Sequence, residues 1–362
     1  MPNGTISFLQ ASMILMLMCG LASHVIVNPM MLDVAGRDAW ISVLLTSILF
    51  LPWCLILLLI MKKSGQQKLQ PWLAQQTTPF LSWVILAPVL VILYLIGGMT
   101  IVHTTVWTIT NYLPASPKFI LITALVLVCQ YPARVSIRAI AIASGILLPT
   151  VVTLGIFVSV ANSTQKNYAM LKPFLENGWQ PAFNGIMYAA GGLVELFVVV
   201  LMQHHLKTKA SWWKLLLLAS MLVYITVGPL IGAITEFGPH EAAKQMISPY
   251  EQWRLVKLGD YVEHVDFLSV FQWLSGASIR ISLSLFLLAD ILPLRNTKSR
   301  NWLILLVSLS YIVLAMLPIN QDAFYLWMFQ DYFPPCLYTI LIVTGIWMAV
   351  ALMTKPPKEK VS

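Results

Sequence analysis

Charged residues are scarce in this sequence, and their scarcity limits the classes of protein it can encode. Asp, Glu, Lys and Arg make up 10% of the 362 residues, whereas hydrophobic residues make up 59%. Soluble domains carry about 25% charged and 45–50% apolar residues, so a soluble enzyme is excluded. Because about 20 apolar residues in a helix cross the hydrocarbon of a bilayer, the sequence predicts an all-α integral membrane protein of about ten transmembrane helices.

Cysteine is also rare, and the common catalytic signatures are absent. All four cysteines lie inside apolar runs, at Cys19, Cys54, Cys129 and Cys336. A thiol in such a run usually behaves as a small hydrophobe, so we expect neither a disulfide framework nor a metal site. The chain contains no HExxH, GxSxG, P-loop or dinucleotide motif, and His24, His103 and His264 are isolated in helical runs. We therefore expect no cofactor, no metal and no enzymatic activity.

Basic residues exceed acidic ones, 22 to 14, but they are scattered between the apolar runs. A nucleic-acid-binding protein gathers its basic residues on one soluble face, so no nucleic-acid partner is expected. With the amino terminus in the cytoplasm, twice as many Lys and Arg residues lie inside as outside. The positive-inside rule therefore predicts that both termini are cytoplasmic.

The sequence predicts one transmembrane domain, 1–354, followed by a basic cytoplasmic tail, 355–362. Windows of about 19 residues, scored for apolar character, divide the domain into ten spans. The predicted spans are 6–32, 38–61, 80–113, 117–131, 137–161, 182–205, 211–235, 262–293, 301–318 and 331–354. The long polar stretch 236–260 is predicted to be an external loop with a short interfacial helix.

Small residues interrupt two of these spans near their centres. The interrupting residues are Gly20, Leu21, Ala22 and Ser23 in the first span and Ala190, Gly191 and Gly192 in the sixth. Each is the first span of a group of five, and an odd number of spans turns the second group upside down relative to the first. The pattern predicts a 5+5 inverted repeat, over 6–161 and 182–354, with broken helices one and six.

Broken helices offer bare backbone groups to a ligand. The amino end of a half-helix presents free N–H groups and a positive dipole to a substrate carboxylate, and freed carbonyls accept from an ammonium. Tyr94 and Tyr188 are further candidates for the lining of this ligand site. The alternative for all of these residues is close packing between helices, and the sequence leaves that alternative open.

Two residues of opposite charge fall near the middle of spans six and eight, Glu195 and Arg280. A charge at that depth costs a few kcal/mol on the insertion scales, and the guanidinium cannot lose its proton. Glu195 is the one acidic residue predicted at a similar depth, so the two should pair. A structural ion pair and a transport or gating element are both compatible with this placement.

Three runs resemble a known family: GRDAW at 36–40, FGPHEAA at 237–243, and FQWLSG at 271–276 leading to Arg280. They resemble the spore germination permeases, the B subunits of nutrient germinant receptors, within the amino acid, polyamine and organocation transporter superfamily. Glu195 matches an acidic position of the family's sixth helix. Ser23 and His24 depart from the small, apolar character that is usual in the family after the glycine of the first helix.

The resemblance implies a multi-pass protein of the spore inner membrane that contacts membrane lipid. It also implies an A subunit and a lipoprotein C subunit as partners, and a small-molecule germinant, such as an amino acid, as ligand. The leading hypothesis is therefore a ligand-sensing, permease-like subunit of a germinant receptor. The alternative is a self-sufficient, proton-coupled amino-acid transporter, with Glu195 as the coupling residue. An integral membrane enzyme would need a cluster of acid, base and nucleophile, which the sequence lacks.

Overall fold

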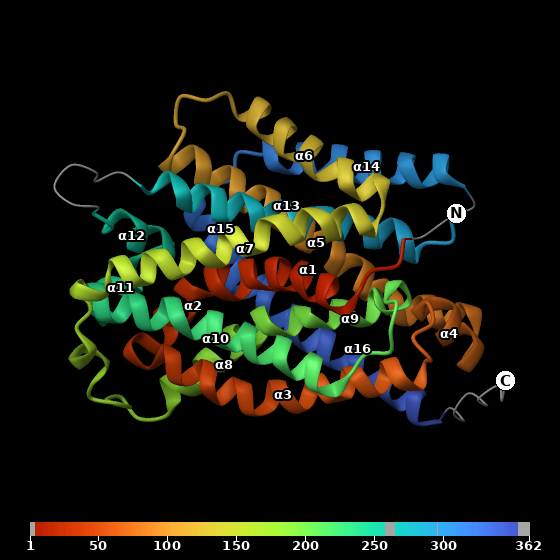
Figure 1. Ribbon diagram of the computed structural model, residues 1–362, viewed down its shortest axis with the longest axis horizontal. Coiled ribbons are helices and arrows are strands. Elements are labelled where there is room, and N and C mark those ends of the chain that lie inside the picture. Colours follow the sequence, from red (N-terminus) through yellow and green to blue (C-terminus); the bar gives the residue numbers. More distant parts are fainter. Residues whose placement is uncertain (1–3, 258–264, 295, 354–362) are drawn as a thin grey trace.

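The computed structural model describes residues 4–257, 265–294 and 296–353. Within these ranges the chain is helical, and its one β-bridge joins Ile6 to Leu206. Figure 1 shows the long helices side by side along the longest axis, with the start of α1 and the end of α16 at the same end. The predicted all-α fold is confirmed.

Nine apolar helical runs in the described part of the chain are long enough to cross a membrane. The first run, Phe8–Lys63, has 56 residues and turns at Gly36, where φ is 51°. At about 1.5 Å per residue it is far longer than a bilayer is thick, so it makes two crossings. The runs then supply ten crossings.

The segments of the ten crossings are α1 (Phe8–Leu21) with α2 (Asn28–Ala35), α3 (Ala39–Lys63), α5 (Pro79–Asn111), α6 (Lys118–Val135), α7 (Ile137–Ala161), α8 (Gln180–Leu193) with α9 (Val198–Leu201), α10 (Trp212–Phe237), α13 (Phe267–Ile291), α14 (Thr297–Met316), and α15 (Gln321–Trp327) with α16 (Phe333–Met353). Most ends lie within a few residues of the predicted ones. The first residues of the predicted span 262–293 and the tail 355–362 fall outside the described residues. The division into inverted halves stays a prediction.

Three short helices connect the crossings. Helix α4 (Leu69–Gln76) follows α3 and was not predicted, whereas the loop predicted to hold one interfacial helix holds two, α11 (Pro239–Lys244) and α12 (Ser248–Arg254). Gly238 separates α10 from α11 with a φ of 80°, a conformation that glycine adopts without steric cost. Pro239 then begins α11, because proline needs no hydrogen-bond donor in the first turn.

Span ten is broken, which the sequence analysis did not predict. A π-helical turn, η7 (Met328–Tyr332), joins α15 to α16. Pro334 and Pro335 lie in the first turn of α16, and neither has an N–H to donate to the carbonyl four residues earlier, which lies within η7. The wider π-helical turn is a known way of accommodating such a disturbance, so this span begins at Gln321 rather than at 331.

The central helices of the bundle are buried, and the peripheral helices expose apolar side chains on their outer faces. From Arg280 to Ile291, every residue of α13 is buried. In contrast, α7 exposes Ile146, Ile156 and Val160 by 68%, 61% and 65%. Large exposed apolar surfaces mark contact with another apolar phase, and the length of the helices identifies that phase as lipid.

Candidate functional site

At the interruptions of spans one and six the backbone changes from α-helix to another helix type, and it remains helical throughout. In span one, α1 ends at Leu21 and a π-helical turn, η1 (Ala22–Ile26), leads into α2. In span six, α8 ends at Leu193 and the tighter 3₁₀ turn η5 (Val194–Phe197) leads into α9. A local change of helix type of this kind often marks a functional site. The predicted breaks are thus present as a wide turn and a narrow turn.

The two breaks lie against each other. A Cβ added to Gly192 would be 3.2 Å from Ser23 Cα and 3.1 Å from a Val27 methyl, and one added to Gly191 would be 3.2 Å from the Phe333 ring. Glycine therefore lets spans one, six and ten approach closely. The predicted residues Gly20, Leu21, Ala22, Ser23, Gly191 and Gly192 are all buried, and Ala190 is half-buried.

Polar atoms are buried around the wide turn. The hydroxyl oxygen of Ser23 and the side-chain carbonyl oxygen of Asn28 have no hydrogen-bond partner among the described residues. The Asn28 amide nitrogen donates to the His24 carbonyl at 3.2 Å, and His24 Nδ1 lies 2.8 Å from the Ile225 carbonyl of α10. Because buried polar groups are rarely left unpaired, Ser23 and Asn28 are candidates to bind a ligand.

Glu195, which lies within the narrow turn η5, forms a buried, two-pronged ion pair with Arg280 of α13. Arg280 Nη2 donates to Glu195 Oε1 at 2.6 Å, and Nη1 donates to Oε2. Arg280 Nε donates to Thr100 Oγ1 at 2.8 Å, and Nη1 also donates to the Met18 carbonyl at 3.0 Å. Both charged side chains are fully buried. The guanidinium therefore joins spans one, three, six and eight.

The break in span one creates one of these contacts. The N–H of Ala22 donates to the Cys19 carbonyl, three residues back, rather than to Met18, four residues back. The Met18 carbonyl accepts instead from Arg280. The ion pair and the change of helix type are therefore parts of one arrangement.

The two predicted tyrosines lie in different places. Tyr188 stacks on Phe329 of η7, with ring centroids 4.6 Å apart, and so lies beside the break of span ten. The hydroxyl of Tyr94 donates to Ser310 Oγ at 3.1 Å, and its ring centroid is 5.1 Å from that of Tyr311. The structure brings Tyr94 against α14 rather than against the paired breaks, and its place in a ligand site stays a prediction.

A cavity lies next to the wide turn of span one. Its lining includes Ile26, Pro29, His103, Trp107, Ile247 and Tyr325. These residues come from span one, α5, the segment between α11 and α12, and α15. Sequence reasoning missed this cavity because no local pattern links four such distant segments.

Comparison with known proteins agrees with this architecture. Residues 5–324 match the model of a family described as spore germination protein. Spore germination protein XB of Bacillus anthracis is 37% identical over 350 residues, which cover 95% of this chain and 98% of that relative. The chain belongs to the spore germination permease family.

As a spore germination permease, the protein has a membrane role in germination, and the resemblance in its three sequence runs is confirmed. The family suggests a receptor-like or transporter-like protein rather than an enzyme. It also suggests receptor partners associated with the membrane. Gly20, Ser23, Glu195 and Arg280 all fall within the matched region, 5–324.

Proposed function

We propose that this permease is the ligand-sensing B subunit of a spore germinant receptor and binds a nutrient germinant, an amino acid, at the paired breaks. The observation that carries the proposal is the contact between the breaks of spans one and six, with the backbone of Ser23 against Gly192. Paired discontinuous helices hold the substrate in transporters built from repeats. The unpaired oxygens of Ser23 and Asn28 support an ammonium-bearing or hydroxyl-bearing ligand.

The proposed switch is a movement of the breaks. Gly192 and Ser23 are in contact in this structure, so an amino acid between them would require the two spans to separate. A small cavity lies beside Ile26 and Pro29, next to the wide turn of span one. A ligand shifts the equilibrium toward the separated state only by its greater affinity for that state. The A subunit and the lipoprotein C subunit would then receive the change in the spore inner membrane.

The second candidate is a self-sufficient, proton-coupled amino-acid transporter, favoured by the burial of Glu195 beside the breaks. The two candidates differ in their need for partners. A transporter moves an amino acid alone, whereas a receptor subunit acts through the subunits that it contacts.

We expect spores that lack this gene to lose germination with one class of nutrient and to keep it with others. Screening single amino acids and sugars identifies that class, and restoring the gene should restore the response. The purified protein in liposomes should then bind the identified nutrient without accumulating it. Uptake of labelled nutrient by the protein alone would favour the transporter, and unchanged germination with every nutrient would contradict both candidates.

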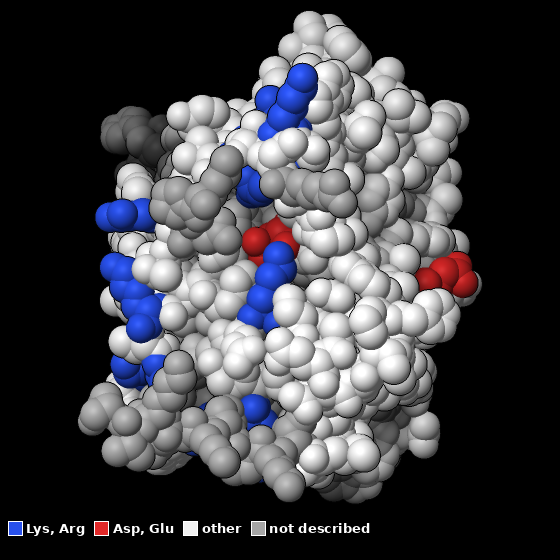
Figure 2. All heavy atoms as spheres, turned by 90° about the vertical axis from the view of Figure 1, so that its right-hand side faces the viewer, with Lys and Arg blue, Asp and Glu red and all other residues white. Residues whose placement is uncertain are grey.

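The distribution of charge supports cytoplasmic termini. The end of the bundle near the start of α1 also holds Lys207, whose N–H donates to the Ile6 carbonyl, and Arg300, which donates to the Arg134 carbonyl. Figure 2 shows Lys and Arg side chains spread over this face, with acidic side chains in few places. At the opposite end, Arg37 pairs with Glu176. The positive-inside rule counts the first end as cytoplasmic.

We therefore expect reporter fusions after Lys68, Arg138, Lys209 and Arg300 to behave as cytoplasmic. Fusions after Lys172 and Arg254 should behave as external, because these residues lie between crossings at the other end. An alkaline phosphatase and fluorescent-protein pair reports both states. A reversed pattern at two or more sites would contradict the orientation.

A further inference from the structure

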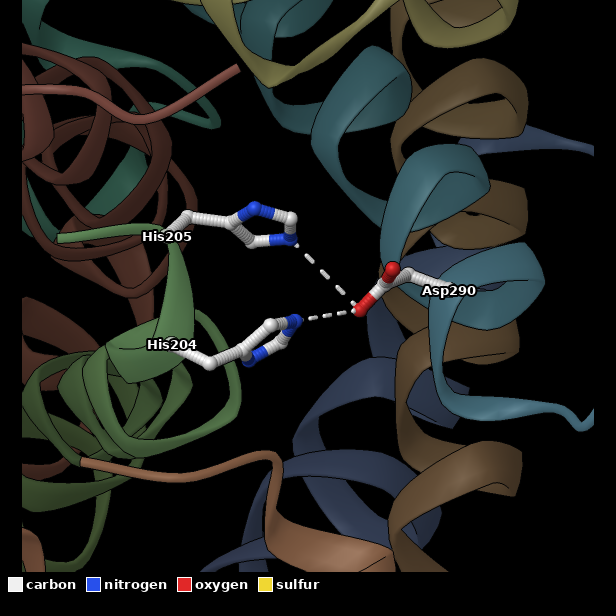
Figure 3. A group of neighbouring side chains, drawn as sticks. All are labelled: His204, His205 and Asp290. Atoms are coloured by element: carbon white, nitrogen blue, oxygen red, sulfur yellow. Dashed lines mark ion pairs between the residues drawn. The ribbon is translucent and has the colours of Figure 1, made fainter. Parts of the chain in front are cut away.

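Two adjacent histidines and an aspartate meet at the end of the bundle where α1 starts. His204 and His205 belong to a 3₁₀ turn, η6 (Gln203–His205), that ends span six, and Asp290 lies in the last turn of α13. Figure 3 shows both imidazoles pointing toward the Asp290 carboxylate. His204 Nε2 is 2.9 Å and His205 Nε2 is 3.6 Å from Asp290 Oδ2.

These three facing atoms are buried, and both imidazole nitrogens lie within ion-pair distance of the same carboxylate oxygen. Apart from one another, His205 Nε2, His204 Nε2 and Asp290 Oδ2 have no hydrogen-bond partner among the described residues. The His205 side chain is 1% exposed and the Asp290 side chain 9%. Buried polar atoms are nearly always satisfied, and here two imidazole nitrogens converge on one oxygen, an arrangement that could hold a shared ion.

A cation is one partner that suits all three atoms. When the Nε2 lone pairs of both imidazoles face Asp290 Oδ2, lone pairs face lone pairs, and an ion between them removes that repulsion. If both are protonated, two imidazolium rings only 4.0 Å apart and the ammonium of Lys68, 3.9 Å from Asp290 Oδ1, share one carboxylate. A single divalent ion between the three atoms satisfies all of them.

We propose that His204, His205 and Asp290 bind a divalent transition-metal ion, for which zinc is the best match. Two imidazoles and a carboxylate are a recurrent zinc ligand set, with a fourth position left to water. Ligand atoms around a tetrahedral zinc ion lie roughly 3.3–3.5 Å apart by its bond lengths; the His205–Asp290 distance of 3.6 Å is close to this, and the His204–Asp290 distance of 2.9 Å would have to lengthen. The three candidate ligand atoms all lie within 4.8 Å of one another.

Lys68 competes with such an ion. Its ammonium donates to the Asp290 backbone carbonyl and approaches Oδ1, the carboxylate oxygen that the histidines do not face. The Lys68 side chain is 34% exposed and can move toward solvent when a metal binds. A small cavity lined by Lys68, His204 and Asp290 gives the open fourth position access to a water ligand.

The metal would join span six, which carries one of the two paired breaks, to span eight, which carries Arg280. His205 follows η5 and α9 in span six, and Asp290 lies in α13, the helix that carries Arg280. A bound ion would hold the ends of spans six and eight together at this end of the bundle. The proposal departs from the expectation of no metal, which rested on the cysteines in apolar runs and on the isolated His24, His103 and His264.

The test is zinc binding by the purified full-length protein in detergent, prepared with an affinity tag that contains no histidine. Titration calorimetry should give one site per chain. His204→Gln, His205→Gln and Asp290→Asn should each weaken binding by about tenfold or more, because even indirect partners of a metal cost that much. Lys68→Gln should tighten binding, since it removes a competing positive charge.

The matched control is His240→Gln. His240 also lies beside a carboxylate, 3.2 Å from Glu241, but its side chain is 81% exposed, so this variant should bind zinc like the parent. When cobalt replaces zinc, the parent protein should show the intense visible absorption of four-coordinate cobalt. This measurement needs no variant, so it tests the proposal even if the variants fail to fold. Absence of that absorption, or zinc affinity that falls with His240→Gln and not with His205→Gln, would overturn the proposal.

Discussion

Glu195→Gln should sharply lower the amount of this protein in the membrane. It leaves the Arg280 guanidinium fully buried without an anion, facing only neutral acceptors: the introduced amide oxygen, Thr100 Oγ1 and the Met18 carbonyl. Removing one partner of a buried ion pair costs roughly 3–5 kcal/mol in soluble proteins. Arg280→Gln should be less damaging, because a carboxylate can take up a proton and a guanidinium cannot. Immunoblots of membranes and thermal unfolding in detergent measure both effects.

The double variant separates a structural role from a functional one. Glu195→Gln with Arg280→Gln leaves no unpaired charge, so its abundance should exceed that of the worse single variant. If Glu195 also carries a proton or a cation, the double variant should be present in the membrane and give no response to germinant. Recovery of both abundance and response would limit the pair to structure.

The control for this series is an exposed ion pair in the same chain. Arg37 Nη1 lies 2.7 Å from Glu176 Oε2, with side chains 21% and 53% exposed. Such pairs contribute about 0–1 kcal/mol, so Arg37→Gln should leave abundance near that of the parent. Parent-like abundance and response in both single variants at Glu195 and Arg280 would contradict the proposed importance of the buried pair.

The crossings could be predicted because the bilayer imposes their length and apolarity. Predicted and observed bounds are identical for 137–161, and 211–235 differs from Trp212–Phe237 by one or two residues. The break in span ten was missed, although Pro334 and Pro335 were a visible signal. The spans were predicted from uninterrupted runs of apolar residues. A helix that changes from α to π within such a run leaves the run uninterrupted, so this signal does not reveal the break.

The candidate site could be predicted only where a residue type is rare. A buried carboxylate and a buried guanidinium are so costly in lipid that Glu195 and Arg280 stood out singly, and the structure places them in contact. Tyr94 carried no such constraint, because a tyrosine that packs on α14 looks the same in the sequence as one in a pocket. Asp290 was read as part of an apolar span, so His204 and His205 had no evident third ligand.

The packing at the breaks explains why the glycines of span six predicted the position of the candidate site better than Tyr94 did. Glycine within a helix is unfavourable by about 1 kcal/mol relative to alanine, so a glycine pair in a transmembrane helix calls for a specific reason. The structure supplies that reason at Gly191 and Gly192, which face Phe333 and the backbone of Ser23. Close packing and ligand binding therefore involve the same residues, and an experiment must distinguish them.

Gly192→Val should abolish the germinant response while the protein still accumulates in the membrane. The added Cβ meets Ser23 Cα at 3.2 Å, and because that atom belongs to the backbone, no side chain can turn away to relieve the contact. Overpacking typically costs 1–3 kcal/mol, which a membrane bundle of this size should tolerate. The valine side chain would, however, hold spans one and six apart whether or not ligand is bound, so ligand binding could no longer change the distance between them.

Gly191→Val should also abolish the response, by pressing on the Phe333 ring at 3.2 Å and so on span ten. The matched control is Gly228→Val, the same change within α10 at a glycine where an added Cβ meets no atom of another helix within 4 Å. Germination of spores against germinant concentration, with immunoblots of their membranes, measures response and abundance together. If Gly192→Val spores germinate at an unchanged germinant concentration, the contact between the breaks is packing alone, because a ligand site built on that contact could not survive the displacement of its backbone.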